Sequence, residues 1–553
     1  MIRLAILTLS LAVAGVAAAA AQHDLPGARI DSVFLDMNRS DRPGCTLGVF
    51  SGGEVAYAKG YGMANLEYGI ALQPRSVFHI ASISKQFTAF AVELLVSDGL
   101  ASWDDDIRTY VPEIPDYGQR ITLRDLVHHV SGIRDQWNLL YMAGWRWEAD
   151  LVTQANVLEI LSRQKALNFE PGAEYLYSNS GFTLLAVVVE RVSGKTLREF
   201  AHERIFAPLG MTSTHFHDDH ETIVPDRAYG YRFNDEEGWK ISIPDFDVVG
   251  ATSLFTTVED MAKWNSNQRD HSIGDHDLYE RFFERGVLNN GDTLTYAHGI
   301  TVSEYRGQTV VGHGGSDAGY RTHYLRFPNL DVGIVSFCNF ARANPSAYVR
   351  RVADILLEDN LDPVAEDGSP PEIDTASWGS TFTTMRGFYR DPRTDIPLHV
   401  WLHDGKARLS QGFGRDSSGA LLVPQGSNRF ALWPGDDIVT VEMRGADPEA
   451  IESSSRRYTY LGLAVTDANP DDYVGLYWSD ELGTEYRVEV DTVTEGGIAL
   501  LHRTQDTERF RPAYRDGFFA GGDWLTFVRD AQGRVTGFTW SNGRVRKVAF
   551  TRR

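Results

Sequence analysis

Two serines stand just before a lysine in the stretch HIASISKQFTAF, residues 79–90. Ser82 and Lys85 are three residues apart, so on a helix they share one face about one turn apart. A lysine ammonium lowers the cost of a serine alkoxide, and a desolvated neutral lysine can take the serine proton itself. Ser84 is adjacent to Lys85 and points elsewhere. The pattern predicts Ser82 as a nucleophile with Lys85 as its proton partner; the alternative is an ordinary helix N-cap beside a solvated lysine.

The same Ser-x-x-Lys spacing recurs at Ser162 and Lys165, so the spacing alone carries little information. Ser162 lies late in the amphipathic run NVLEILSRQKAL, and we expect it on the surface. Ser82 instead follows the extended apolar stretch SVFHIA and precedes a helical pattern that ends at Asp98-Gly99. We expect Ser82 at a helix N-terminus, where free backbone N–H groups and the helix dipole favour a developing negative charge.

Tyr177 and Asn179 lie two residues apart at a turn, ahead of the apolar helical pattern FTLLAVVV. Both side chains could face one pocket. The phenol could then share a proton with Lys85, and the amide could hold a substrate amide. The alternative is a buried tyrosine followed by a capping asparagine.

His313, Gly314, Gly315 and Ser316 fall in a strand-like segment, VVGHGGSDAGY. Glycines allow a substrate backbone to approach a strand edge closely. His313 could donate a hydrogen bond near the tyrosine; taken alone, the motif is more often a structural histidine or a chance glycine-rich turn. The neighbouring GGSDAG is not a nucleophile elbow, because alanine takes the place of the final glycine.

Two other clusters carry less weight. Three histidines in THFHDDHE have the composition of a metal cluster, but we expect them to be solvated in a loop and predict no metal site. The three histidines are His215, His217 and His220. Aromatic residues also recur every four positions at Trp137, Tyr141 and Trp145, which predicts packing or a pocket wall.

The elements that must position these residues divide the chain. Residues 25–360 read as strands at both ends with helices between, which predicts a mostly antiparallel sheet covered by helices. Residues 361–376 are acidic and proline-rich, as in a linker. Residues 377–468 and 469–553 read as short strands with hairpin turns at Asp404-Gly405 and Asn542-Gly543, which predicts two small β-barrels, or one larger barrel or sandwich.

The ends and the charge of the chain limit its partners. Residues 1–21 combine Arg3, an apolar run and a small-residue cleavage site, which predicts a removed signal peptide and a periplasmic or secreted protein without stable membrane insertion; the alternative is an uncleaved anchor. A net charge of −22 argues against nucleic acid and anionic membranes. We expect a small-molecule or short-peptide substrate, and a homodimer is compatible with the sequence. Cys45 and Cys338 are consistent with one disulfide or with two buried thiols.

The order Ser-x-x-Lys, Tyr-x-Asn, His-x-Gly resembles the penicillin-recognising serine hydrolases, which include class C β-lactamases, D-Ala-D-Ala carboxypeptidases, esterases and D-aminopeptidases. The likeness covers residues 30–355 and extends to ITLRDLVHHVSGI and GATSLFTTVEDMAKW. It implies a β-lactamase-like α/β sandwich with a helical lobe, acylation of Ser82, and proton transfer by Lys85 and Tyr177. It also implies an oxyanion hole from the N–H groups of Ser82 and Ser316, and a substrate contact from Asn179. No cofactor is implied.

The chain departs from this pattern at His313-Gly314-Gly315, where class C β-lactamases usually carry Lys-Thr-Gly. The histidine and the two β-blocks make the sequence most similar to D-aminopeptidases, in which a barrel loop reaches the site and can select a free amino terminus. We expect that loop within residues 503–520. The alternatives are a carboxylesterase, a D-Ala-D-Ala carboxypeptidase or weak β-lactamase, and a non-catalytic ligand receptor.

Overall fold

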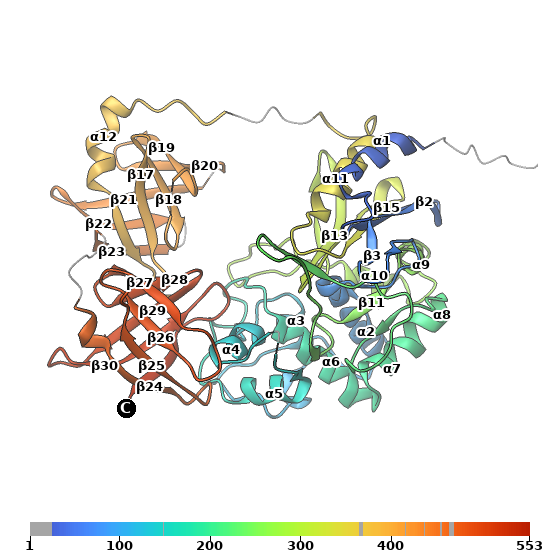
Figure 1. Cartoon of the computed structure of the whole chain (residues 1–553), viewed down its shortest axis with the longest axis horizontal. Coiled ribbons are helices and arrows are strands. Elements are labelled where there is room, and N and C mark those ends of the chain that lie inside the picture. The colour runs from blue at the N-terminus through green and yellow to red at the C-terminus, as the bar shows by residue number, and fades with distance from the viewer. Residues whose placement is uncertain are drawn as a thin grey trace, which may run out of the picture.

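The computed structural model describes residues 25–147, 149–363, 369–414, 416–435, 437–453, 456–463 and 469–553. The predicted signal peptide, 1–21, lies outside them, as do residues 364–368 of the predicted linker. An α/β body occupies one half of the molecule and two β-barrels, one above the other, occupy the other half (Figure 1). In the described part of the chain, no helix has both the length and the apolar character needed to cross a bilayer.

The body is built on a six-stranded antiparallel sheet in the order β12-β13-β14-β15-β1-β2. The two ends of the predicted 25–360 region meet in it, because β1 pairs with β15. Gly52 and Gly53 both have positive φ in the two-residue turn between β1 and β2, as a tight hairpin requires. The strands are β1 Cys45–Ser51, β2 Glu54–Tyr61, β12 Thr301–Tyr305, β13 Gln308–Asp317, β14 Tyr320–Phe327 and β15 Val332–Cys338.

Helices cover both faces of this sheet, which confirms the predicted sandwich. α1 and α11 pack on one face, and α9 and the helical lobe on the other. Within the lobe, α2 packs against α6, and α2 is buried over most of its length. The main helices are α1 Gly27–Ser32, α2 Ser84–Ser97, α3 Leu123–Val127, α4 Gln136–Met142, α5 Gln154–Ser162, α6 Asn179–Ser193, α7 Leu197–Ala201, α9 Val258–Asp270, α10 His276–Phe282 and α11 Pro345–Leu356.

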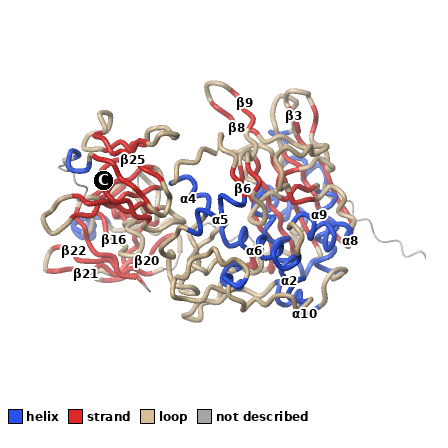
Figure 2. Tube along the Cα trace, turned by 90° about the horizontal axis from the view of Figure 1, so that it is seen from below, coloured by secondary structure: helices blue, strands red, loops and turns tan. Residues whose placement is uncertain are grey.

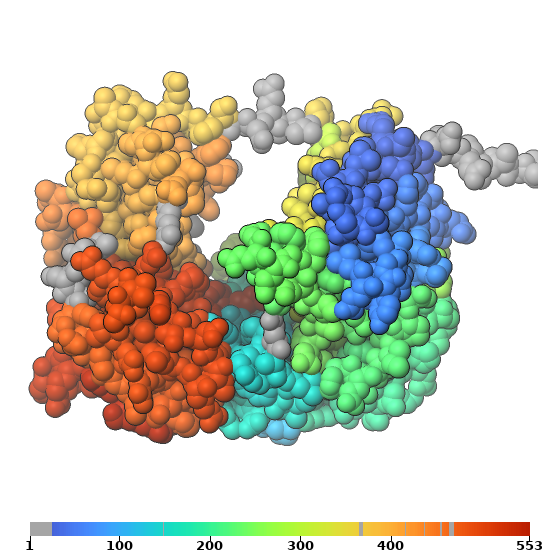
Figure 3. Space-filling model, in the orientation of Figure 1, coloured from blue at the N-terminus to red at the C-terminus, as the bar shows by residue number. Residues whose placement is uncertain are grey.

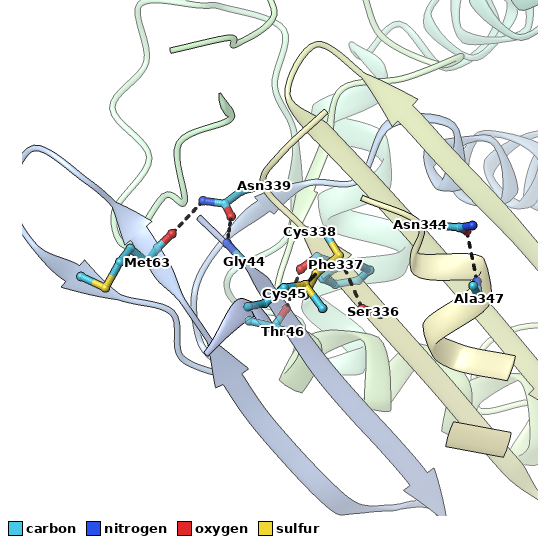
Figure 4. Close-up of a disulfide and its surroundings, with 11 residues drawn as sticks. Gly44, Cys45, Thr46, Met63, Ser336, Phe337, Cys338, Asn339, Asn344 and Ala347 are labelled. Carbon is cyan, nitrogen blue, oxygen red and sulfur yellow. Dashed lines mark hydrogen bonds between the residues drawn. A yellow bond between two sulfur atoms is a disulfide. The ribbon is translucent and has the colours of Figure 1, made fainter. Parts of the chain in front are cut away.

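Cys45 and Cys338 form a disulfide, so the alternative of two thiols is wrong for this structure. The two residues stand directly opposite each other in the β1–β15 register, and both are fully buried (Figure 4). Beside them, the Asn339 side chain accepts from the Gly44 N–H and donates to the Met63 carbonyl. The bridge therefore joins the first strand of the body to the last.

The C-terminal region forms two closed eight-stranded barrels, which settles the choice between two small barrels and one larger one. Asp404 and Gly405 both have positive φ in the turn between β17 and β18, as predicted. The first barrel comprises β16 Gly387–Arg390, β17 Leu398–His403, β18 Lys406–Gln411, β19 Ala420–Gly426, β20 Arg429–Trp433, β21 Ile438–Arg444, β22 Asp447–Ser453 and β23 Arg456–Gly462. The second comprises β24 Gly475–Ser479, β25 Thr484–Val490, β26 Ile498–Leu501, β27 Glu508–Tyr514, β28 Gly517–Ala520, β29 Asp523–Arg529, β30 Val535–Ser541 and β31 Val548–Arg552.

A helix precedes the first barrel where the sequence predicted none. α12, Thr375–Thr384, begins inside the predicted linker and is capped by Asp374. Trp378 and Phe382 pack against the core of the barrel. Aromatic burial against the barrel thus organises a segment whose own sequence shows no clear helical period.

The second barrel packs against α4 and α5 of the body, as two views of the chain show (Figures 1 and 2). Arg134 donates to Glu481 at 2.5 Å, and these side chains are 2% and 6% exposed. Gln505 donates to the backbone carbonyls of Tyr141 and Trp145 at the end of α4. The barrel is therefore held to the body by buried polar contacts.

Candidate active site

A cleft of about 1290 Å³ opens between the helical lobe, the end of β13 and the second barrel. Open space also separates the first barrel, at the upper left, from the α/β body beside it (Figure 3). All of the predicted site residues except Lys85 line the cleft, and one residue of the second barrel joins them. They are Ser82, Tyr177, Asn179, His313, Gly314, Gly315, Ser316 and Arg544.

Ser82 lies in a single 3-10 turn, Ala81–Ile83, that leads directly into α2. Ala81 has φ +50°, a strained conformation for an alanine that turns the chain into the helix. Ser84 is fully buried; its Oγ donates to the Ala81 carbonyl at 2.5 Å and accepts from the Leu254 N–H at 3.0 Å. Ser84 thus fixes the turn, and Ser82 alone faces the cleft.

Lys85 is fully buried behind Ser82. Its Nζ lies 3.2 Å from Ser82 Oγ, 2.8 Å from Asn179 Oδ1 and 2.7 Å from the Ala251 carbonyl. Burial lowers the pKa of Lys85 well below its usual value; the charge of Asp135 opposes this and that of Arg544 adds to it. A neutral amine has two N–H groups and one lone pair. When the two N–H groups donate to Asn179 and Ala251, the lone pair faces Ser82.

Tyr177 lies on the other side of Lys85, whose Nζ is 4.8 Å from the centre of the phenol ring. Burial raises the pKa of Tyr177, and a hydrogen bond with Ser82 and the charge of Arg544 lower it only in part. The phenol is therefore protonated at neutral pH and can act as a proton donor. His129 packs on the ring at 4.2 Å between centroids and accepts from the Ser178 N–H at 3.2 Å.

Asn179 begins α6, and a buried carboxylate that the sequence did not reveal holds it in place. Asp135 Oδ2 accepts from the backbone N–H of Asn179 at 2.7 Å and from its side-chain amide at 2.8 Å. Asp135 Oδ1 accepts from the N–H groups of Trp137 and Asn138, which caps α4. With its amide nitrogen held by Asp135, the Asn179 oxygen turns to Lys85.

His313 does not have the partner that was predicted. Its Nε2 lies 3.0 Å from Tyr296 Oη and its Nδ1 lies 2.6 Å from the Gly314 carbonyl, while its ring centre is 6.2 Å from that of Tyr177. A carbonyl only accepts, so Nδ1 carries the proton and Nε2 accepts from Tyr296. Burial lowers the pKa of His313 to about 3, and the ring is neutral. His313 was expected to form a hydrogen bond near Tyr177, but its partner is the buried Tyr296.

The end of β13 presents a strand edge to the cleft. β12 pairs with β13 over residues 308–312, so in the described chain residues 313–317 have a strand partner only on the β14 side. A Cβ on Gly315 would come within 2.3 Å of the Ile80 carbonyl, which explains a glycine where the strand passes the Ser82 turn. Thr322 of β14 donates to the same carbonyl at 2.8 Å. Ser316 is exposed at this edge.

The barrel loop that reaches the cleft is 542–547 and not the predicted 503–520. Arg544 lies over Tyr177, with its guanidinium 4.9 Å from the ring centre. The predicted two-residue turn at Asn542-Gly543 is wrong, because neither residue has positive φ and β31 begins only at Val548. Asn542 Oδ1 instead accepts from the N–H groups of Arg544 and Val545, which opens the hairpin into a loop.

The histidines were expected to be solvated in a loop, which is right for the exposed His220 and wrong for His217 and His215. His217 is 5% exposed, and His215 belongs to β7, His215–Phe216, in a small sheet with β5, Phe78–His79, and β11, Leu254–Thr256. His217 and His220 line the cleft. These elements lie far apart in the chain, so no local pattern predicts the burial.

Among the described residues, Asp219, His220 and Asp247 bring potential ligand atoms within 4.8 Å of one another. His220 Nδ1 lies 3.0 Å from Asp247 Oδ1. All three are exposed or half-buried, and this contact is an ordinary ion pair, so we assign no metal here. The second Ser-x-x-Lys pair is structural: Ser162 Oγ donates to the Glu159 carbonyl and Lys165 pairs with Asp480 of the barrel.

The fold and the cleft together define a serine hydrolase with a lysine beside its nucleophile. Residues 30–358 match the Beta-lactamase family, so the chain belongs to that family. A D-aminopeptidase of Brucella anthropi is 27% identical over 530 residues, spanning 92% of this chain and 95% of the relative. A D-aminopeptidase of Cereibacter sphaeroides is 26% identical over 525 residues, spanning 92% and 96%.

Solved structures share the fold. A penicillin-binding protein homologue from Pyrococcus abyssi, described as octameric, has a TM-score of 0.54 at 23% identity and covers 78% of this chain and 100% of its own. A D-amino acid amidase from Ochrobactrum anthropi with bound D-phenylalanine has a TM-score of 0.50 at 21% identity, covering 60% and 99%.

Proposed function

We propose that this protein hydrolyses amide bonds next to an N-terminal D-amino acid through an acyl-enzyme on Ser82. The observation that carries the proposal is the Lys85 amine, buried and 3.2 Å from Ser82 Oγ, with its two other neighbours both acceptors. The D-aminopeptidases that are similar over 92% of the chain support the substrate class.

In the first step, Ser82 Oγ attacks the amide carbonyl carbon while its proton passes to the neutral Lys85 amine. The carbonyl oxygen becomes an oxyanion, for which the N–H groups of Ser82 and Ser316 are the expected donors, each typically worth about 3 kcal/mol. The exposed Ser316 at the strand edge beside the Ser82 turn supports this assignment.

In the second step, the carbon–nitrogen bond breaks and the leaving amine takes a proton. Tyr177 is protonated and hydrogen-bonded to Ser82, which suits it to hand on the proton that Lys85 received. Water then attacks the Ser82 ester, gives its proton back through the same pair, and releases the acid. The sum is one amide and one water converted to one acid and one amine.

The proposal includes export. The predicted signal peptide and the buried Cys45–Cys338 disulfide both suit an oxidising compartment. Fractionation of cells that produce the whole chain tests this: recovery of the shortened protein outside the cytoplasm supports it, and an uncleaved cytoplasmic protein contradicts it. Light scattering on the same material determines whether the protein forms the homodimer with which its sequence is compatible.

The catalytic proposal is tested by labelling with a fluorophosphonate and by a substrate panel. We expect label on Ser82, loss of label in Ser82→Ala and full label in Ser162→Ala, the matched serine of the second Ser-x-x-Lys pair. The panel pairs D- and L-aminoacyl anilides with their N-acetylated forms, short-chain esters and nitrocefin. Equal rates for free and acetylated substrates would rule out the aminopeptidase assignment.

A further inference from the structure

Arg544 brings a cation to the wall of the cleft beside the nucleophile. Its side chain is 43% exposed and lines the cleft, with the guanidinium 4.9 Å from the centre of the Tyr177 ring. Asp135 is its carboxylate neighbour, at 3.8 Å between Nη1 and Oδ2, which is too long for a hydrogen bond. The five N–H groups of the guanidinium make no hydrogen bond to any residue in the described part of the chain.

Asp135 does not account for this arginine. The carboxylate is fully buried and already accepts four N–H groups, two from Asn179 and one each from Trp137 and Asn138. Its oxygens are therefore satisfied without Arg544. An arginine kept for Asp135 alone would approach to hydrogen-bond distance and turn away from the cleft.

The loop that carries Arg544 is fixed on both sides of it. Asn168 donates to the Arg544 carbonyl at 2.9 Å and accepts from the Arg546 N–H at 2.8 Å. The Arg546 side chain donates to both carboxylate oxygens of Glu174, and Val545 is fully buried. The loop backbone is thus held to the body by hydrogen bonds, and the loop places the Arg544 side chain in the wall of the cleft.

The cleft as a whole is cationic, although the chain carries a net charge of −22. Among the described residues that line it, five are arginine or lysine and two are aspartate. Asp317 also accepts from Thr252 and lies 3.1 Å from His79 Nε2. This charge attracts an anionic group of the substrate. The basic residues are Arg227, Arg232, Lys240, Arg321 and Arg544, and the acidic ones are Asp245 and Asp317.

We propose that Arg544 binds a carboxylate on the leaving group, so that the preferred substrate is a peptide whose second residue ends in a free carboxylate. The proposal rests on the proposed function, because Tyr177 hands its proton to the leaving amine and Arg544 lies against Tyr177. A planar guanidinium can hold both oxygens of one carboxylate. A D-aminoacyl dipeptide has such a group two bonds from the scissile nitrogen; its amide and an anilide do not.

The experiment compares D-alanyl-glycine with D-alanyl-glycinamide, which differ only in the carboxylate. For the native protein we expect kcat/KM to favour the free acid by about ten- to a hundredfold, the usual size of a charge-assisted hydrogen bond. Arg544→Gln should abolish this preference mainly through KM of the free acid, and Arg544→Lys should retain part of it. The preference of the native protein should also fall as salt is raised.

Lys547→Gln is the matched control. It removes the same charge from the same loop, but Lys547 donates to the Pro392 carbonyl and does not line the cleft. It should leave the preference unchanged, and thermal melting checks that each variant is folded.

The outcomes separate the two proposals. If the native protein cleaves the acid and the amide equally, or if Arg544→Gln slows both by the same factor, the carboxylate site is wrong and the proposed function stands. If neither compound is cleaved and Ser82 takes no label, the proposed function itself has failed, and the carboxylate site with it.

Discussion

The Arg544 guanidinium of the second barrel lies 4.9 Å from the centre of the Tyr177 ring in the body. A positive charge there disfavours protonated Lys85 and favours ionised Tyr177, so it lowers the pKa of both groups. Two domains thus set the acid–base balance of one nucleophile.

Arg544→Gln should therefore raise the pKa of Lys85 in the free enzyme. Because the base must be neutral, the acid limb of the pH profile of kcat/KM should move to higher pH, and Arg544→Lys should restore it. The profile is measured on D-alanyl-glycinamide, which has no carboxylate, so that loss of a carboxylate contact does not contribute. An acid limb that stays in place would show that this charge does not reach Lys85.

Ser84→Ala should cost stability and spare labelling, the reverse of Ser82→Ala. Ser84 is buried and its Oγ both donates to Ala81 and accepts from Leu254. Removing it leaves the Leu254 N–H without this partner, at a cost of about 1–3 kcal/mol, while the Ala81 carbonyl still accepts from a backbone N–H of the turn. Urea unfolding and fluorophosphonate labelling of both variants test the assignment. If folded Ser84→Ala lost the label, Ser84 and not Ser82 would be the nucleophile.

Two adjacent acidic residues of the barrel should behave differently. Glu481→Gln leaves the buried Arg134 charge without its partner, for an expected loss of about 3 kcal/mol or more. Asp480→Asn removes an exposed partner of Lys165 and should barely move the unfolding midpoint. Urea unfolding compares the two isosteric variants. Equal losses would mean that the barrel is not anchored through Arg134.

The disulfide leads to two predictions, one on the number of free thiols and one on the free energy of unfolding. Native protein denatured without reductant should show no free thiol, and two after reduction. The bridge links residues 293 apart in the chain, so Cys45→Ala with Cys338→Ala should destabilise the protein by about 2–4 kcal/mol. Free thiols in protein recovered from the periplasm would contradict the bridge.

Sequence patterns predicted residues that the structure brings together in one cleft, because their arrangement is local. Ser82 and Lys85 lie three residues apart at the start of α2, and Tyr177 lies two residues before Asn179 at the start of α6, so their spacing is visible in the chain. The sandwich and both barrels follow from strand and turn patterns of the same short range. Asp135, Ala251 and Tyr296 were missed because each meets the site from a distant part of the chain.

Two predictions that were made from local sequence patterns are wrong, and both concern segments near the cleft. Asn542-Gly543 has the sequence of a tight hairpin turn, yet the Asn542 side chain satisfies the backbone and the loop spreads over the body. His217 has polar neighbours in sequence, yet it is buried against strands from two other parts of the chain. In both cases contact with the body decides the conformation, which the turn and loop patterns alone do not contain.

The loop at 542–547 also orders events during synthesis. The ribosome makes Ser82 long before Arg544, and β31, which follows Arg544 in the chain, must join β24 and β30 before the loop is held. A nascent chain that has folded only its body thus carries Ser82, Lys85 and Tyr177 without Arg544. The guanidinium reaches the cleft only when the second barrel has closed.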